Sequence, residues 1–339
     1  MRKTTFDLKL WAYHLVSLLA GFVILALLIY GAGYKKFFNI LTQASIGWIL
    51  ISVLVYAASW IFRVWRLEWF TKQTGISIKL FELFKLYISG FALNVILPAK
   101  LGDAAMIGYL RLQGINVGWA AAIIFQTRIL DLLSLLFLCM PAVIFLFTNG
   151  VPNWISASLW VCLIIALIPF GAIYLDKQHV IPSLIAGLER KLGRRFLKLF
   201  LSKIGDAYLS YREIIANKKL TVISFLLSVT IWFLEALSCY LLAIALNAEI
   251  KLNVVLFAVC LSNLAKIIPA TPGSIGIYES ILTAILVMLG VPFDVALALS
   301  ILDQAIKKIF NLSFGLPATT SIGFKMSHLI ERYRQEVRT

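Results

Sequence analysis

Two groups of charged residues lie inside long apolar stretches of the chain, and they are the first residues that could do chemistry. Arg128 and Asp131 are three residues apart, which places both on one face of a helix. Asp303 and Lys307 are four apart in a later stretch and would also share a face. Charges inside a membrane are costly and often mark the path of a substrate or ion. The alternative is that each group is an ion pair within its helix that only helps the helices to pack.

A phosphate group is the ligand that best suits Arg128, because a guanidinium can donate two parallel hydrogen bonds to it. Two acids, Asp103 and Glu279, follow breaks that contain Pro and Gly. Each could complement the dipole of a helix that starts at its break. Each could also pair with Arg128 or Lys307 when the site is empty, or take up a proton to drive exchange.

Two lysines, Lys100 and Lys266, lie beside the same breaks and could attract an anionic headgroup. The alternative for each is that its ammonium group reaches out to the membrane surface. The candidate substrate-binding residues are therefore Lys100, Asp103, Arg128, Asp131, Lys266, Glu279, Asp303 and Lys307. The three histidines lack the spacing of metal ligands, so we predict no metal and no other cofactor.

The elements that must position these residues are apolar helices. Hydrophobic residues make up 61% of the 339 residues and charged residues only 14%. A soluble domain cannot bury that much apolar surface. Several uncharged runs exceed the roughly 20 residues that cross a bilayer. Since these runs are continuous rather than alternating, they favour helices over a β-barrel. The sequence thus predicts an all-α, polytopic integral membrane protein.

Six runs are long enough for full crossings, and two further regions are interrupted. The predicted spans are 11–31, 44–62, 118–147, 154–175, 220–246 and 295–322. The regions 81–112 and 253–290 contain Pro and Gly, and each half is short for a crossing. Such segments are typical of re-entrant, broken-helix hairpins. The predicted turn residues are Pro98, Gly102, Pro269, Pro272, Gly273 and Gly276.

The distribution of Lys and Arg predicts the orientation. If each hairpin returns to the side that it left and the N-terminus is inside, the cytoplasmic segments hold 21 Lys and Arg and the outer segments 3. Both termini are therefore predicted to lie in the cytoplasm, with the chain in the cell (inner or plasma) membrane. The net charge of +15 then faces anionic lipid headgroups, and no nucleic acid is needed to explain it.

The basic segment 176–219 is predicted to be an amphipathic helix that lies on the inner leaflet, because apolar residues recur at helical spacing opposite several Lys and Arg. A solvated linker helix is the alternative. We find no second domain, and residues 1–339 are interpreted as a single transmembrane domain.

An internal repeat is indicated by polar residues that recur at one fixed offset, with repeats of about 44–147 and 220–322. An odd number of crossings separates equivalent points, so the two halves would be inverted with respect to the membrane. Hairpin tips that enter from opposite faces would bring two positive helix ends together, which suits an anion such as phosphate. The alternative is a chance alignment of two broken helices. The matching pairs are Asp103 and Glu279, Gly114 and Gly290, Arg128 and Gln304, and Asp131 and Lys307.

Three motifs resemble a known family, the lysylphosphatidylglycerol synthase transmembrane domain, or flippase-like domain, over roughly residues 10–325. They are Asn94-Val-Ile-Leu-Pro-Ala-Lys-Leu-Gly-Asp103, Arg128-Ile-Leu-Asp131 and Pro269-Ala-Thr-Pro-Gly-Ser-Ile-Gly-Ile-Tyr-Glu279. The chain departs from the family pattern with Lys100 for Arg, Asp103 for Glu and Gln304 for a basic residue. Full-length synthases carry a soluble aminoacyl-transferase domain, and this chain has no room for one after its last span. The resemblance implies the lipid-translocating part.

Three functions follow as hypotheses. The first is a flippase-like lipid transporter for an anionic lipid, either an aminoacylated phospholipid or a polyprenyl-phosphate-linked substrate. No phosphate-binding loop of the GxxxxGK[ST] type occurs, so ATP would not drive it directly. The second is a membrane-embedded, lipid-modifying transferase, against which stands the lack of any nucleotide, metal or nucleophile motif. The third is a non-catalytic partner of a separate lipid or glycan enzyme. A homo-oligomer is compatible with all three, and we expect the chain not to be an enzyme.

Overall fold

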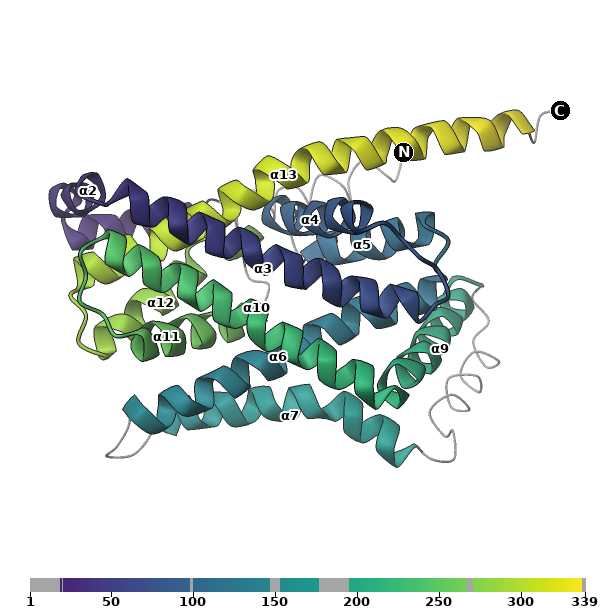
Figure 1. Ribbon diagram of the computed structural model, residues 1–339, viewed down its shortest axis with the longest axis horizontal. Coiled ribbons are helices and arrows are strands. Elements are labelled where there is room, and N and C mark those ends of the chain that lie inside the picture. The colour runs from purple at the N-terminus through teal and green to yellow at the C-terminus, as the bar shows by residue number, and fades with distance from the viewer. Residues whose placement is uncertain are drawn as a thin grey trace.

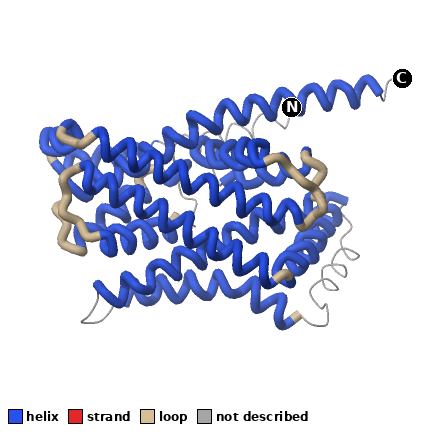
Figure 2. The backbone as a smooth tube through the Cα atoms, in the orientation of Figure 1, coloured by secondary structure: helices blue, strands red, loops and turns tan. Residues whose placement is uncertain are grey.

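The described residues form a bundle of helices that run mostly along the long axis of the molecule (Figure 1, Figure 2). The computed structural model describes residues 19, 21–97, 100–146, 153–176, 195–266 and 271–336. No β-strand occurs within these residues, and the prediction of an all-helical chain is confirmed.

The helices vary widely in length, from a single 3-10 turn to a helix of 44 residues. In chain order they are Gly21–Ala32, α2 (Tyr34–Thr42), α3 (Ile46–Lys72), α4 (Leu80–Ile96), α5 (Leu101–Leu112), α6 (Val117–Leu146), α7 (Asn153–Leu175), α9 (Arg195–Ala216), α10 (Lys218–Ala245), α11 (Leu252–Ala265), η2 (Pro272–Ser274), α12 (Ile277–Met288) and α13 (Phe293–Glu336).

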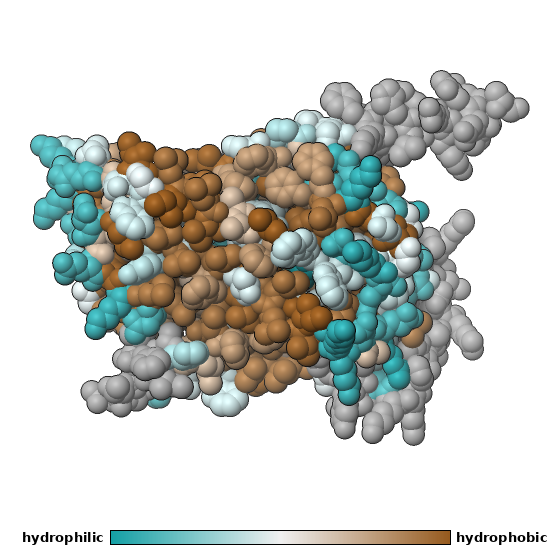
Figure 3. All heavy atoms as spheres, viewed as in Figure 1, coloured by the Kyte–Doolittle hydropathy of each residue, from teal (hydrophilic) through white to brown (hydrophobic). Residues whose placement is uncertain are grey.

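Three described helices are long and apolar enough to cross a membrane: Ile46–Lys72, Val117–Pro141 and Lys218–Ala245. A fourth is added if Gly21–Ala32 and Tyr34–Thr42, which meet at an angle of 91°, are one bent span. Figure 3 shows hydrophobic residues over the middle of one face and hydrophilic residues at both ends. A membrane-spanning bundle has this distribution. The number of six full spans stays a prediction.

The centre of the bundle is the pair α3 and α10, which run antiparallel. Ser52 and Ser238 exchange hydrogen bonds between each hydroxyl and the other residue's carbonyl, at 2.9 and 3.1 Å. Further along, the guanidinium of Arg66 donates to the hydroxyl of Ser228 at 2.5 Å. The residue number falls on α10 as it rises on α3, so the two helices have opposite directions.

The helix that contains the predicted span 44–62 is longer than that span. Helix α3 continues to Lys72, and it carries Arg63 and Arg66 into the protein interior, where both side chains are buried. The predicted orientation counts Arg63 and Arg66 among the basic residues of a cytoplasmic segment, 63–80. Because both side chains are buried in the protein, these two do not face the cytoplasm. The helix can continue because acids on α6 and α10 neutralise both guanidinium groups.

The two regions predicted to be broken are each interrupted helix pairs. In the first, α4 ends at Ile96 and α5 begins at Leu101. In the second, α11 ends at Ala265, η2 follows, and α12 begins at Ile277. Helices α5 and α12 have 12 residues each. Such a helix is about 18 Å long, which is short of the roughly 30 Å hydrocarbon core.

The predicted turn residues that the structure describes lie at or next to these breaks. Gly102 lies in the first turn of α5, and Gly276 is the N-cap of α12, with a φ of 82° that favours glycine. Pro272 and Gly273 form η2. The other two predicted turn residues, Pro98 and Pro269, lie outside the described residues.

Close backbone contact holds α4 against α5. A Cβ atom added to Gly102 would lie 2.7 Å from Oδ1 of Asn94 and would overlap with the carbonyl oxygen of Gly90. Only glycine fits here. In Figure 1 this pair lies toward the end of the molecule that holds α9, whereas α11 and α12 lie toward the end that holds α2. The two interrupted pairs thus approach the middle of the bundle from opposite ends.

Helix bounds recur at the offset of the predicted repeat. The number of residues from the start of α5 to the start of α12 equals the number from the start of α6 to the start of α13. The glycine that follows each short helix has a φ of 93° or 92°. Each following long helix contains a proline at the same offset. The matched positions are Leu101 and Ile277, Gly114 and Gly290, Val117 and Phe293, and Pro141 and Pro317. The re-entrant course and the inversion relative to a membrane stay predictions.

The basic segment forms a helix, α9, over its later part, and α9 packs against α6. The hydroxyl of Tyr208 donates to Asp176, just beyond the end of α7, at 2.7 Å. Burial and this hydrogen bond raise the pKa of Tyr208 to about 12. Residues 177–194 of the segment lie outside the described part of the chain. The placement of α9 on the inner leaflet stays a prediction.

Candidate functional site

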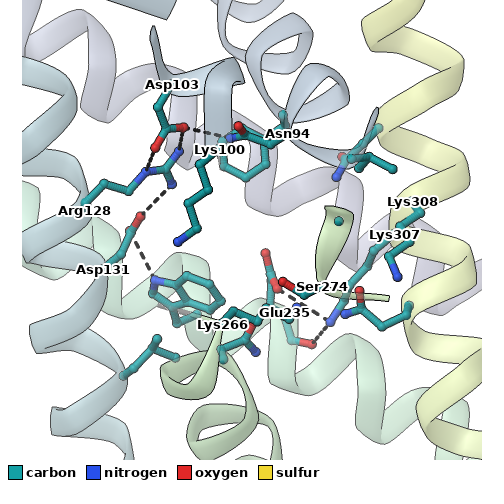
Figure 4. A pocket seen from close by; sticks show the side chains of 18 of the residues that line it. Asn94, Lys100, Asp103, Arg128, Asp131, Glu235, Lys266, Ser274, Lys307 and Lys308 are labelled. Atoms are coloured by element: carbon teal, nitrogen blue, oxygen red, sulfur yellow. Dashed lines mark hydrogen bonds and ion pairs between the residues drawn. The ribbon is translucent and has the colours of Figure 1, made fainter. Parts of the chain in front are cut away.

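A cavity of about 430 Å³ lies between the two helix breaks. The first break contributes Lys100 and Asp103, and the second contributes Lys266, Gly273 and Ser274 (Figure 4). Helices α6, α10 and α13 supply much of the remaining wall, and α3, α4, α7 and α11 also contribute residues to it. Two clusters of buried apolar side chains flank it, one centred on α11 and α12 and the other on α3 and α4. Its size is within the usual range for a small-molecule site.

Arg128 holds Asp103 at one side of the cavity. Its Nε and Nη2 donate to the two carboxylate oxygens at 3.0 and 2.6 Å. The amide of Asn94, on α4, donates to the same carboxylate at 2.8 Å. Nη1 of Arg128 lies 3.6 Å from Asp131, the pairing expected from their spacing. The guanidinium still faces the cavity, because about 30% of the side chain is exposed.

Asp131 has a stronger partner than Arg128, and it is one that sequence reasoning missed. Nη1 of Arg66 lies 2.5 Å from its carboxylate. The indole of Trp232, on α10, donates to the same oxygen at 3.1 Å. Arg66 also donates to the hydroxyl of Tyr87 at 3.1 Å. Asp131 therefore ties α3, α6 and α10 together at the cavity wall.

Glu235 neutralises a buried arginine of α3, as Asp131 does, on the other side of the cavity. It pairs with the guanidinium of Arg63 and lies 3.6 Å from Nζ of Lys307. Lys307 is also 2.8 Å from Asp303, in the predicted i,i+4 pair. The hydroxyl of Tyr278 donates to Asp303 at 2.9 Å. Sequence spacing indicates no partner for Glu235, because that partner lies on another helix.

Glu279 lies behind the wall rather than in it. Its carboxylate accepts the backbone N–H of Gly276 at 2.8 Å, which satisfies a free donor at the start of α12. The other oxygen lies 3.1 Å from Nζ of Lys308. Lys308 itself lines the cavity. Glu279 thus caps a helix and neutralises a cation, and its cation is Lys308 instead of the neighbouring Lys307.

Lys100 and Lys266 differ from the other cations around the cavity, since neither has a carboxylate within ion-pair distance among the described residues. Lys100 is the N-cap of α5 and has a φ of 55°, a left-handed conformation that favours glycine. In Figure 4 its side chain extends into the cavity. Nζ of Lys266 lies 3.7 Å from the centre of the Tyr278 ring.

The cavity brings together most of the predicted binding residues. Asp303 and Glu279 are buried outside its wall and act on Lys307 and Lys308. A usable signal for the missed arginines was the apolar helical pattern that continues past residue 62. Those that line the cavity are Lys100, Asp103, Arg128, Asp131, Lys266 and Lys307. Those that sequence reasoning missed or left without a role are Arg63, Arg66, Asn94, Trp232, Glu235 and Lys308.

No group of three or more His, Cys, Asp or Glu that could hold a metal ion occurs among the described residues. The four cysteines are free, and three of them are buried.

A family model described as the lysylphosphatidylglycerol synthase TM region matches residues 14–315. The chain belongs to this family. The match covers both interrupted helix pairs and every residue of the cavity. It makes the chain a multi-pass membrane protein, in agreement with its apolar helices.

Several archaeal proteins are similar to this member of the family over most of their length. The UPF0104 membrane protein PH1989 of Pyrococcus horikoshii is 22% identical over 85% of this chain and 91% of its own. A UPF0104 membrane protein of Methanothermobacter thermautotrophicus is 24% identical over 92% and 96%. The glycosyltransferase AglD of Haloferax volcanii is 23% identical over 93% of this chain but only 56% of its own length.

Proposed function

We propose that this family member binds the anionic headgroup of a membrane lipid in the cavity and carries the lipid across the membrane. The observation that carries the proposal is that two lysines, one from each helix break, face a single cavity without carboxylate partners among the described residues. Both lysines are half-buried, and an anionic headgroup would supply the counter-charge that the protein does not place beside them. Arg128, on the same wall, adds a guanidinium suited to phosphate.

An apolar side of the cavity supports a lipid rather than a soluble anion. Leu132 and Leu135 of α6 line it together with Ile165 of α7. Ile165 is 44% exposed on the surface of the helix bundle. The cavity therefore borders both charged groups and the outer apolar surface. A lipid could place its headgroup among the charges while its chains stay along α6 and α7.

The matched helix bounds support an inverted repeat. Helices α3 and α10, which begin the two predicted repeats, are antiparallel, and one offset relates both the short helices and the long helices that follow them. An inverted repeat offers two related conformations, each open to one side of the membrane. From the Lys and Arg distribution we also propose that the protein lies in the plasma membrane and that both termini face the cytoplasm.

Lipid translocation in proteoliposomes tests the proposal. We expect the wild-type protein to move a fluorescent anionic lipid between leaflets, and Arg128→Ala to reduce the rate by about tenfold or more, as loss of a charged contact of about 1.4 kcal/mol or more does. Arg111→Ala is the matched control, since Arg111 is exposed at the end of α5 and does not line this cavity. Its rate should equal that of the wild type.

Two results would contradict the proposal. If wild-type proteoliposomes move lipid no faster than protein-free vesicles, the transport proposal is wrong. If Arg128→Ala and Glu279→Gln both leave translocation and folding unchanged, the cavity is not the site, and a scaffolding role fits better.

A glycan-related role is the second candidate, and the likeness to the protein named glycosyltransferase AglD favours it. In this version the chain holds a polyprenyl-phosphate-linked sugar for a separately encoded enzyme. Copurification of such an enzyme, together with loss of glycan product but no loss of translocation in Arg128→Ala, would support this candidate over the first.

A further inference from the structure

We infer that the headgroup carries two negative charges on phosphate, as in a lipid phosphomonoester or a lipid diphosphate. A singly charged phosphodiester or a headgroup with an added amine would fit less well. This inference rests on the proposed function and names the substrate class of the same cavity.

The charges around the cavity can be matched one to one. Each of five acids has a cation within ion-pair distance, and two cations remain. The pairs are Arg63 with Glu235, Arg66 with Asp131, Arg128 with Asp103, Lys307 with Asp303, and Lys308 with Glu279. The remaining cations are Lys100 and Lys266, so within the described residues the cluster has an excess of two positive charges.

The backbone of Lys100 indicates that its ammonium group is needed at the site. Its φ of 55° is left-handed, which is unfavourable for a residue with a side chain. The equivalent N-cap of α12 is Gly276, with a φ of 82°. A glycine would serve the turn at Lys100 equally well. Strained residues of this kind tend to occur at functional sites, where the surrounding fold holds them in place.

Lys266 is held from the other side. It is the C-cap of α11, and its ammonium lies over the ring of Tyr278, 3.7 Å from the centre. A ring face attracts a cation without neutralising it. The hydroxyl of Tyr278 is already bonded to Asp303, so the ring is fixed in position. Lys266 is thus placed at the cavity without a carboxylate to neutralise it among the described residues.

The size of the charge excess decides between classes of headgroup. A phosphodiester such as phosphatidylglycerol has one negative charge and leaves one ammonium uncompensated. A headgroup that adds an amine leaves both. A phosphomonoester carries about −1.5 to −2 at neutral pH and neutralises the pair. Two ammonium groups, one at each helix break, also suit a headgroup whose negative charge is spread over several oxygens.

The cavity also offers neutral donors for the oxygens of such a group. The side chains of Gln304, Asn263 and Asn311 line it, and Ser274 adds a hydroxyl from η2. No side-chain hydrogen bond caps α5 among the described residues, so the first backbone N–H groups of that helix remain as donors next to Lys100. A phosphate between the two lysines would therefore have partners for its remaining oxygens.

The test compares two lipids with the same acyl chains. The purified full chain is placed in nanodiscs of phosphatidylcholine that contain phosphatidic acid, a phosphomonoester, or phosphatidylglycerol, and the bound lipid is counted by native mass spectrometry. We expect at least about tenfold preference for phosphatidic acid, which corresponds to about 1.4 kcal/mol. In Lys100→Gln and in Lys266→Gln the preference should shrink to threefold or less.

Two controls keep this result specific. Lys251→Gln removes an exposed lysine at the far end of α11 from Lys266 and should keep the full preference. Lys100→Gln and Lys266→Gln should melt at or close to the wild-type temperature without lipid, because each removes a half-buried charge that has no carboxylate partner among the described residues. Lys100→Arg and Lys266→Arg keep the charge and should restore most of the preference.

Three other outcomes would contradict this inference, and they differ in what they imply for the proposed function. If phosphatidylglycerol binds and moves as well as phosphatidic acid, while Arg128→Ala still abolishes movement of both, the double-charge inference is wrong and lipid transport stands. If inorganic phosphate at millimolar concentration displaces phosphatidic acid, the site is one for free phosphate, and the lipid class is wrong. If neither lipid binds or moves, the proposed function fails, and this inference fails with it.

Discussion

Arg128 and Asp103 are joined by two hydrogen bonds, of 2.6 and 3.0 Å, at the point where the short helix α5 begins. The two residues are 25 positions apart, and their contact fixes the first helix break against α6. Arg128 is also the cation of the cavity best suited to phosphate. Under the proposed function, an incoming headgroup must share this guanidinium with Asp103 or displace the carboxylate.

If Asp103 and the headgroup compete for Arg128, removal of the carboxylate should strengthen lipid binding and slow lipid transport. In Asp103→Asn the carboxylate no longer occupies Arg128, so the anionic lipid should bind more tightly, by about three- to tenfold or up to about 1.4 kcal/mol. Release should slow, because nothing replaces the lipid on the guanidinium. We expect a lower translocation rate together with more lipid bound per protein, measured on the same preparation.

Asp206→Asn is the control for this change, because Asp206 pairs with Lys203 on α9, and both side chains are about half exposed. It should alter neither quantity. If Asp103→Asn weakens lipid binding instead, Asp103 does not compete for Arg128, and its role is to hold the break in place.

Removing the acid that serves both Arg63 and Lys307 should be strongly destabilising. Glu235→Gln leaves the fully buried guanidinium of Arg63 without its counter-charge. Loss of one partner of a buried pair costs about 3–5 kcal/mol. We expect a large drop in melting temperature in detergent. The double variant Arg63→Gln with Glu235→Gln should recover part of the loss, because no charge is then left unpaired.

Glu68→Gln provides the surface comparison. Glu68 pairs with Lys72 on the same helix, but Lys72 is 58% exposed. An exposed pair contributes about 1 kcal/mol or less. Its melting temperature should stay close to the wild-type value, and equal losses in Glu68→Gln and Glu235→Gln would contradict the assignment of Glu235 to a buried network.

Close packing of the first helix pair makes Gly102 sensitive to a single methyl group. In Gly102→Ala the new Cβ would overlap with the carbonyl oxygen of Gly90, so α4 and α5 must move apart. We expect a loss of about 1–3 kcal/mol, as in other overpacked interiors, and a cavity that no longer holds lipid. Gly108→Ala, on the same helix, adds a methyl group with no atom within 4 Å and should be neutral or slightly stabilising in thermal unfolding. Equal melting temperatures for the two variants would contradict the close packing at Gly102.

Cysteine labelling tests the re-entrant course. In a background without the native cysteines, Thr74→Cys before α4 and Gln113→Cys after α5 should react with an impermeant maleimide from the same side of the membrane. Glu249→Cys before α11 should react from the opposite side, as should Asp294→Cys after α12. Reaction of Thr74→Cys and Gln113→Cys from different sides would mean that α4 and α5 together cross the membrane, and the two-hairpin arrangement would be wrong.

Local sequence determined the class of protein and much of its outline. Long uncharged runs have few alternatives to helices in a bilayer, so the apolar helices could be predicted without knowledge of their neighbours. Pro and Gly mark the breaks near residues 97–101 and 266–276 for the same local reason. The fixed offset between the two halves was also visible in the sequence, because polar residues are rare enough in apolar helices for a recurrence to stand out.

Only the tertiary structure decided which charges meet. Arg63 was assigned to a surface segment because its neutralising acid, Glu235, lies 172 residues away on another helix. Sequence spacing finds partners three or four residues apart, such as Asp303 and Lys307, and it cannot find partners across a bundle. The excess charge on Lys100 and Lys266 emerges only after every acid around the cavity has been matched with a cation, and that matching depends on which helices pack together.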